Sequence, residues 1–242
     1  MLDYVWLIPA FPALGVLVNG LLGYRYVRDR AGYVGVAATG LSLLVTLALA
    51  AEVVFGGVRG RVTLWSWVAA GDFEAKVSFL VDPLSTVMLL VVAGVGFIIH
   101  VYSVGYMRGD PGYPRFFCYL NLFMVAMLVL VLADNYLLMF VGWEGVGLCS
   151  YLLIGYWYER KSASDAGNKA FIVNRIGDAG FLLGLFLMWT TFGTLEFAPV
   201  FSRAGEVAPA LVTAVAVLLF VGAIGKSAQL PLYVWLPDAM EG

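Results

Sequence analysis

The chain has 242 residues, of which 62% are hydrophobic and only 12% are charged, whereas about 25% of the residues of a soluble domain are charged. This composition and a mean hydropathy of +0.91 exclude an ordinary soluble protein, and a formal net charge of −2 points to no nucleic-acid partner. The single histidine, His100, excludes a histidine-based metal site. Cys118 and Cys149 lie in apolar runs without the spacing of metal ligands or disulfides.

Seven hydrophobic stretches are long enough, at about 20 residues each, to cross a bilayer as helices. Residues 1–18 lack a basic segment and a small-residue cleavage site, so the first stretch is predicted to be a retained span and not a signal peptide. We therefore predict an all-α integral membrane protein with about seven transmembrane helices, the last of them broken. The predicted spans are 4–24, 33–55, 80–104, 115–133, 136–157, 169–192 and 210–235.

The connection between the second and third spans has the pattern of a β-hairpin. Residues 61–67 and 74–79 each alternate polar and apolar side chains, and Gly71 with Asp72 lies near the expected turn. Tryptophans at a membrane interface would look similar, and that alternative stays open. The connection at 193–209 is the other long one, and the loop around Lys161, Asp165 and Lys169 is expected to be solvated.

Lysine and arginine counts predict the orientation, because cytoplasmic loops carry the excess of these residues. The odd-numbered loops contain eight of them and the even-numbered loops contain four. We therefore expect the N-terminus outside and the odd-numbered loops in the cytoplasm. The two remaining basic residues, Arg175 and Lys226, lie inside predicted spans.

The last span is interrupted by polar residues and by Pro231, which removes a backbone donor and clashes with the preceding turn. The helix should therefore break near residues 227–231, as helices do at the ion sites of transporters.

We divide the chain into 1–79, with two spans and the outside hairpin, and 80–242, the start of an ion-translocating domain. Because no polar tail follows Met240, the sequence is expected to be a piece of a longer protein.

Glu144 is the most informative residue. It lies about nine residues into its span, or roughly 13 Å at 1.5 Å per residue, which is deep in the membrane. A carboxylate at that depth costs roughly 2.5–3.5 kcal/mol on insertion scales and marks a functional site by default. Gly142, Gly145 and Gly147 leave room for a neighbouring helix. The alternative is a protonated glutamic acid that only bonds helices together.

Three further charged residues are candidates for proton transfer. Lys226 is the expected partner of Glu144, unless its side chain extends to an interface. Arg175 and Asp178 are three residues apart and share a helix face, so they are expected to form an ion pair that could also alter the field at Glu144. His100, at the end of its span, is expected to be interfacial, and the sequence leaves a relay role open.

Several segments together resemble the large antiporter-like subunit of respiratory complex I, chain L of NADH-quinone oxidoreductase. The resemblance covers nearly the whole chain and is strongest from about residue 80 onward. It rests on Gly105–Met107, Arg115–Phe117, Asn121–Phe123, Gly142–Leu148, Tyr151–Gly155, Lys169–Asp178, Gly193–Leu195, Gly225–Pro231 and Trp235–Met240.

The resemblance implies that Glu144, Lys226, Arg175 and Asp178 belong to a proton path, driven by NADH oxidation and quinone reduction in other subunits. It implies a multi-pass protein of the bacterial inner (plasma) membrane, partnered by other membrane subunits of complex I. It implies no cofactor on this chain, since NADH, FMN, iron–sulfur clusters and quinone bind elsewhere in the complex. Such subunits have 14 or more helices, so a second repeat with its own lysine is missing from this sequence.

Two other functions stay open. A subunit of a multisubunit sodium/proton (Mrp-type) antiporter would share the fold, although those proteins typically read Trp-Glu-Leu-Thr where this chain reads Trp-Glu-Gly-Val at residues 143–146. Sodium-dependent exchange that is unaffected by NADH would identify that class. The third alternative is a fragment that transports nothing, and it predicts no inserted chain in native membranes.

Overall fold

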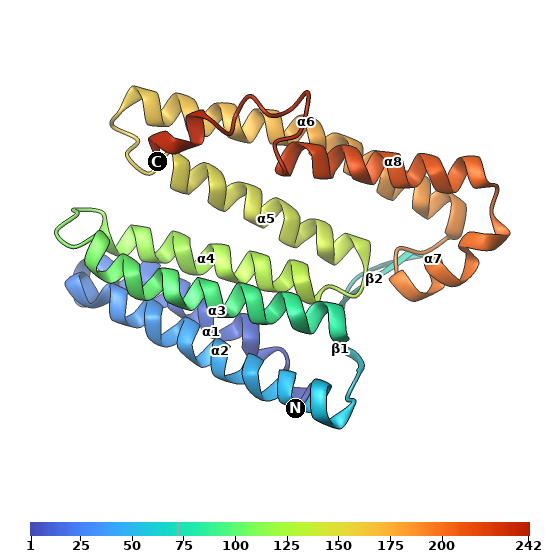
Figure 1. Ribbon diagram of the computed structural model, residues 1–242, viewed down its shortest axis with the longest axis horizontal. Coiled ribbons are helices and arrows are strands. Elements are labelled where there is room, and N and C mark those ends of the chain that lie inside the picture. Colours follow the sequence, from blue (N-terminus) through green and yellow to red (C-terminus); the bar gives the residue numbers. More distant parts are fainter. Residues whose placement is uncertain (72) are drawn as a thin grey trace. The chain divides into compact units, whose positions relative to one another are not determined.

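A computed structural model describes residues 1–71 and 73–242 of the chain. Most of the described chain is helical, with one two-stranded hairpin (Figure 1). The long helices are α1 (Leu7–Leu17), α2 (Ala31–Gly56), α3 (Pro83–Tyr106), α4 (Tyr113–Leu132), α5 (Tyr136–Ile154), α6 (Lys161–Phe192) and α8 (Pro209–Lys226).

The described chain contains six helical segments that are long and apolar enough to cross a membrane. The first of them, Leu2–Gly56, has 55 residues and contains both of the first two predicted spans. It doubles back on itself through the π-helix η2 (Val18–Val27) and the 3-10 helix η3 (Arg28–Arg30). The Ser42 hydroxyl on α2 donates to the Ile8 carbonyl oxygen on α1 over 2.7 Å, as expected of two antiparallel helices. The fold class predicted from sequence is therefore confirmed.

The strands are β1 (Gly60–Ala70) and β2 (Phe73–Val81), paired as the alternating pattern predicted. Gly71 has a left-handed φ of +59°, which glycine adopts without a steric penalty. The predicted turn residue Asp72 lies outside the described residues. The hairpin ends at Asp82, whose side chain accepts a hydrogen bond from the Ser85 backbone amide and caps α3.

The described chain forms two compact units. Unit 1 comprises Met1–Trp65, Val77–Asp134 and Leu138–Cys149, and unit 2 comprises Ser66–Lys76, Asn135–Leu137 and Ser150–Gly242. The division at residue 79 that we predicted remains a prediction.

Unit 1 is built from α1 to α4 and the central part of α5. Its core contains Ile8, Leu49, Leu89, Leu128 and Leu132, all at most 1% exposed. Burying each of these side chains contributes about 1.5–3 kcal/mol in water. In a membrane, where lipid is equally apolar, close packing of these helices has to hold them together.

Unit 2 contains α6 and α8, which pack alongside one another (Figure 1), and the short helix α7 (Phe197–Arg203) within the connection at 193–209. One predicted boundary is wrong here. Helix α6 begins at Lys161 and not near 169, because the segment predicted as a loop forms a helix with an ion pair of 2.6 Å between Lys161 and Asp165. Helix α8 ends at Lys226, directly before the predicted break at residues 227–231.

Candidate functional site

The end of α8 agrees with the break predicted near Pro231. The Ser227 amide donates to the Ala223 carbonyl oxygen, and Ala228 takes a left-handed φ of +49°. The chain then turns back, and the indole nitrogen of Trp235 donates to the Gly225 carbonyl oxygen over 3.0 Å. This bond satisfies one of the last carbonyl groups of α8, which have no partner inside a helix.

Lys226, the last residue of α8, forms an ion pair with Asp178 of α6. Its Nζ atom lies 3.6 Å from Oδ2 of Asp178. The Asp178 side chain is 1% exposed and the Lys226 side chain is 17% exposed. Removing two such charges from water is tolerated when they compensate each other. The structure therefore brings together two of the four predicted site residues.

Small residues make this pairing possible, because they let the backbones of α6 and α8 approach closely. A Cβ atom added at Gly177 would lie 3.1 Å from the Cα atom of Gly225, and one added at Gly180 would lie 2.6 Å from a methyl carbon of Val221. Such contacts between small residues are typical of helix packing in membranes. Gly177 directly precedes Asp178, and Gly225 directly precedes Lys226. The close approach of α6 and α8 is therefore at the same place as the ion pair.

Arg175 is the third candidate. Its guanidinium lies over the ring of Phe171, 4.6 Å from the centroid, and the residue is exposed, whereas Asp178 is buried. The expected ion pair between Arg175 and Asp178 remains a prediction. The neighbouring Asn174 donates to the Ala170 carbonyl oxygen over 2.8 Å.

Glu144, the fourth candidate, lies on the part of α5 that belongs to unit 1 and is partly buried. The predicted role of its neighbouring glycines is confirmed at two positions. A Cβ atom at Gly142 would lie 2.6 Å from the backbone nitrogen of Leu130, and one at Gly145 would lie 2.8 Å from Cβ of Ala126, both on α4. Lys226 belongs to unit 2, so a contact between Glu144 and Lys226 remains a prediction.

The expected interfacial position of His100 remains a prediction; its side chain is 1% exposed inside unit 1. Its Nδ1 atom lies 2.8 Å from the Gly96 carbonyl oxygen, and the ring packs near Phe117. Lys169, expected in a solvated loop, instead pairs with Asp238 over 2.6 Å. In residues 1–71 and 73–242, no three His, Cys, Asp or Glu side chains lie close enough together to hold a metal ion.

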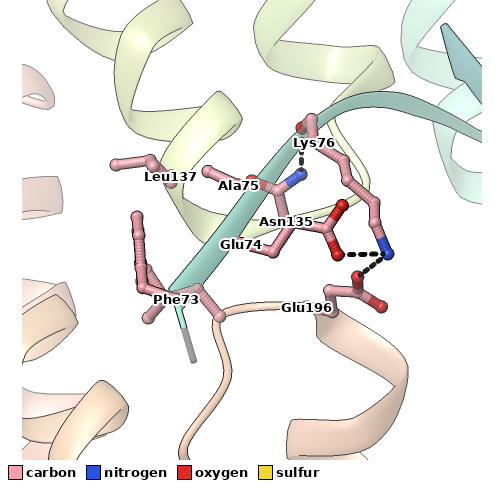
Figure 2. Close-up of a pocket in the computed structure, with 8 residues that line it drawn as sticks. Phe73, Glu74, Ala75, Lys76, Asn135, Leu137 and Glu196 are labelled. Carbon is pink, nitrogen blue, oxygen red and sulfur yellow. Dashed lines mark hydrogen bonds and ion pairs between the residues drawn. The ribbon is translucent and has the colours of Figure 1, made fainter. Parts of the chain in front are cut away.

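A polar cluster in unit 2 was not predicted from the sequence. Lys76 of the hairpin lies 3.3 Å from Glu74 and 3.6 Å from Glu196, and the Asn135 amide donates to the Lys76 carbonyl oxygen over 3.0 Å (Figure 2). The cluster lines a pocket of about 10 Å³, enough for about one water molecule. The alternating charges of β2 were visible in the sequence, but nothing there connected them to Glu196.

Lys76 should help to hold the hairpin against residues 195–196. Its hydrogen bond to Glu74, followed by attraction to Glu196, raises the pKa of Lys76 above its ordinary value of 10.5. The stabilisation is therefore fully present below pH 10.5 and lost as the pH rises through the folded-state pKa. We expect Lys76→Met to speed hydrogen exchange at residues 73–76 and 195–197 about fivefold, as for a surface pair worth about 1 kcal/mol.

This expectation for Lys76 is checked by hydrogen exchange mass spectrometry on the full-length protein. The effect of Lys76→Met should be the same at pH 6 and pH 9, since both lie below the lysine pKa. Lys161→Met is the matched control, because its ion pair with Asp165 is highly exposed and on another element. Equal exchange in the wild type and Lys76→Met would show that the ion pairs do not hold the hairpin.

Two family models match the sequence. The one described as NADH:quinone oxidoreductase/Mrp antiporter, TM, matches residues 133–242, and the one described as NADH-ubiquinone oxidoreductase (complex I), chain 5 N-terminus, matches residues 67–117. The first range contains all four predicted site residues.

Similar proteins and structures agree with these matches. NADH-quinone oxidoreductase subunit L is 46% identical over 99% of this chain in Mycobacterium tuberculosis and 44% identical over 96% in Escherichia coli. In each case the chain spans 38% of the relative. A chain in the structure of the Mrp complex of Dietzia sp. is also similar, with 29% sequence identity and a TM-score of 0.84. The match covers 98% of this chain and 25% of the Dietzia chain. An archaeal membrane-bound sulfane sulfur reductase contains a chain with the same fold, at 20% identity and a TM-score of 0.85, over 97% of this chain and 47% of that one.

The helical fold and the broken α8 define an all-α, antiporter-like membrane fold. Within that class, the chain belongs to the family of NADH-quinone oxidoreductase subunit L, of whose length it spans less than half.

Proposed function

We propose that this chain carries protons in the membrane domain of a proton-pumping NADH-quinone oxidoreductase. The ion pair between Asp178 and Lys226 supports the proposal most directly, because it lies where α8 breaks. Broken helices at membrane depth face protein or a wet cavity and serve as ion sites in transporters. Oxidation of NADH and reduction of quinone belong, on this proposal, to other subunits of the complex.

Lys226 is the group that gains and loses a proton in this proposal. While Lys226 is protonated, the Asp178 carboxylate compensates its charge at a distance of 3.6 Å. When the proton leaves, Lys226 no longer compensates the charge of the aspartate, so the two protonation states favour different positions of the lysine side chain.

Glu144 exchanges protons with this pair, on our proposal, either directly or through water. A carboxylate inside a span is costly unless it is protonated or compensated. A cation that moves toward or away from it therefore changes which form is favoured. Arg175, together with Asp178 on the same helix, modulates the electric field at Glu144. We further propose that the N-terminus lies outside the bacterial inner membrane and that the partners are neighbouring antiporter-like subunits.

The Glu144→Gln change in the full-length protein tests the proposal. We expect the complex to assemble, because glutamine keeps the size of the side chain, and the number of protons pumped per electron to fall. Proton uptake into inside-out vesicles during NADH oxidation measures this ratio. Glu159→Gln is the control, since Glu159 is exposed after α5. A wild-type ratio in Glu144→Gln would overturn the proposed role of this residue.

The similarity to the Mrp complex favours a second candidate, a subunit of a sodium/proton antiporter. The matched chain of the Mrp complex is 29% identical to this chain, whereas subunit L of Mycobacterium tuberculosis is 46% identical. We therefore prefer the oxidoreductase. Exchange driven by a sodium gradient in the absence of NADH would favour the antiporter. Pumping that requires NADH and is unchanged by sodium would favour the oxidoreductase.

A further inference from the structure

A second polar pocket lies in unit 1, where the N-terminal end of α2 meets the turn between α3 and α4. It has a volume of about 480 Å³, within the range of about 300–1,000 Å³ typical of ligand sites. Its lining includes Asp29, Arg30, Tyr33, Arg108 and Tyr113. Tyr113 forms its buried side, where its hydroxyl donates to the Val104 carbonyl oxygen over 3.4 Å.

Positive charge dominates this pocket and its surroundings. Residues 25–30 and 105–115 contain five arginines and two aspartates. The Arg30 and Arg108 guanidinium groups are exposed, and neither forms an ion pair or a hydrogen bond with another side chain in the described parts of the chain, 1–71 and 73–242. Helix α2 begins beside the pocket without a side-chain cap, so its amide groups and its dipole add positive potential. The two arginines and the N-terminal end of α2 together favour the binding of an anion in this pocket.

The surroundings of the pocket have the composition of a membrane interface. Tyrosine is enriched at the level of the lipid headgroups in membrane proteins. Several exposed tyrosines lie in the segments next to the pocket. They are Tyr24, Tyr26, Tyr33, Tyr102 and Tyr106, each at least 59% exposed. Further along α3, Ile98 and Val101 are 66% and 48% exposed, as expected for side chains that face acyl chains. An anion bound here would therefore have a hydrocarbon phase directly beside it.

We infer that this pocket binds the headgroup of an anionic glycerophospholipid, with its phosphate between Arg30 and Arg108 and its acyl chains along α3. Arginine forms paired hydrogen bonds to phosphate oxygens through its planar fork. Asp29 accepts a hydrogen bond from a headgroup hydroxyl, which phosphatidylglycerol has and phosphatidylcholine lacks. Basic pockets between membrane helices recognise anionic lipids in this way. The site is separate from the Asp178–Lys226 pair and does not depend on the proposed proton path.

The test uses the complete complex, carrying either the wild-type sequence or the double variant Arg30→Gln/Arg108→Gln. The complex is delipidated by detergent washing and titrated with phosphatidylglycerol, and the full-length chain is released for native mass spectrometry to count bound lipids. We expect one tightly bound phosphatidylglycerol in the wild type. In the double variant we expect binding about 30-fold weaker, since each arginine near an anionic lipid contributes about 1 kcal/mol.

The matched control is Arg25→Gln/Arg28→Gln, which removes the same charge from the same end of unit 1 without altering the pocket lining. It should keep the bound lipid. Val104→Trp fills the pocket without changing its charge and should also displace the lipid, which tests the site if the arginine variant does not assemble. Equal weakening in both double variants would show only a diffuse attraction to charge and would overturn the proposal.

Two further titrations distinguish the sources of the phosphate. Phosphatidylcholine that binds as tightly as phosphatidylglycerol would overturn the selection for anionic headgroups. Inorganic phosphate at millimolar concentration should leave the lipid bound, because it has no acyl chains to interact with α3. Displacement of the lipid by inorganic phosphate would instead identify a site for a soluble anion and overturn the assignment to a lipid.

Discussion

Lys226→Met in the full-length protein is expected to reduce the proton flux through this subunit at least about 100-fold, the lower end of what a positioned proton-transfer group contributes. Methionine keeps the apolar stem of the side chain but cannot carry a proton. The change also leaves the Asp178 carboxylate, 1% exposed, without the cation that lies 3.6 Å away. Proton pumping per electron in inside-out vesicles measures the loss.

A double variant separates the transport role of this ion pair from its structural role. Breaking a buried pair by removing one partner costs about 3–5 kcal/mol, whereas replacing both partners costs far less. Lys226→Met alone should therefore lower the yield and thermal stability of the complex, and Lys226→Met/Asp178→Asn should restore them. Pumping should remain lost in the double variant, because the proton carrier is still absent.

The exposed pair of Lys169 and Asp238 is the control, with both side chains 44% exposed. Lys169→Met should change stability by about 1 kcal/mol or less. The proposed function fails if the Lys226→Met complex assembles and pumps at the wild-type ratio. A double variant that recovers both stability and pumping would also refute a proton-carrying role for this pair.

Gly142→Ala is expected to destabilise unit 1 by about 2–3 kcal/mol, at the upper end of the range for overpacking. The added Cβ atom would lie 2.6 Å from the Leu130 backbone nitrogen and 2.7 Å from its Cα atom. Because these are backbone atoms, α4 and α5 have to move apart to accommodate the methyl group. Glu144 lies half a turn further along α5, so pumping should fall together with stability.

Gly94→Ala is the matched control for Gly142→Ala. Gly94 lies within α3, and a Cβ atom there would meet no atom within 4 Å. The melting temperature and yield of the purified complex should fall for Gly142→Ala and remain at the wild-type level for Gly94→Ala. Equal behaviour of the two variants would mean that the close contact between α4 and α5 does not limit stability.

The sequence was sufficient for the features that depend on local composition. Apolar runs of about 20 residues located the membrane helices, since lipid admits few other structures. Alternation predicted the hairpin of β1 and β2, and Pro231 predicted the break after Lys226, because a proline inside a helix removes a hydrogen bond. Helix ends were less predictable: α6 begins in a polar segment stabilised by Lys161 and Asp165, which hydropathy alone assigns to a loop.

Only the tertiary structure decided which charged residues meet. The spacing of Arg175 and Asp178 pointed to a pair within α6, which remains a prediction. The close packing of Gly177 against Gly225 brings Lys226 of α8 to Asp178 as well. In the same way, Lys76 reaches Glu196 because the hairpin lies beside residues 195–196. The periodicity of a helix determines which face a residue occupies, whereas its partner depends on which helix packs on that face. That choice is made by the fit of side chains from distant parts of the chain, so it cannot be read from any single segment.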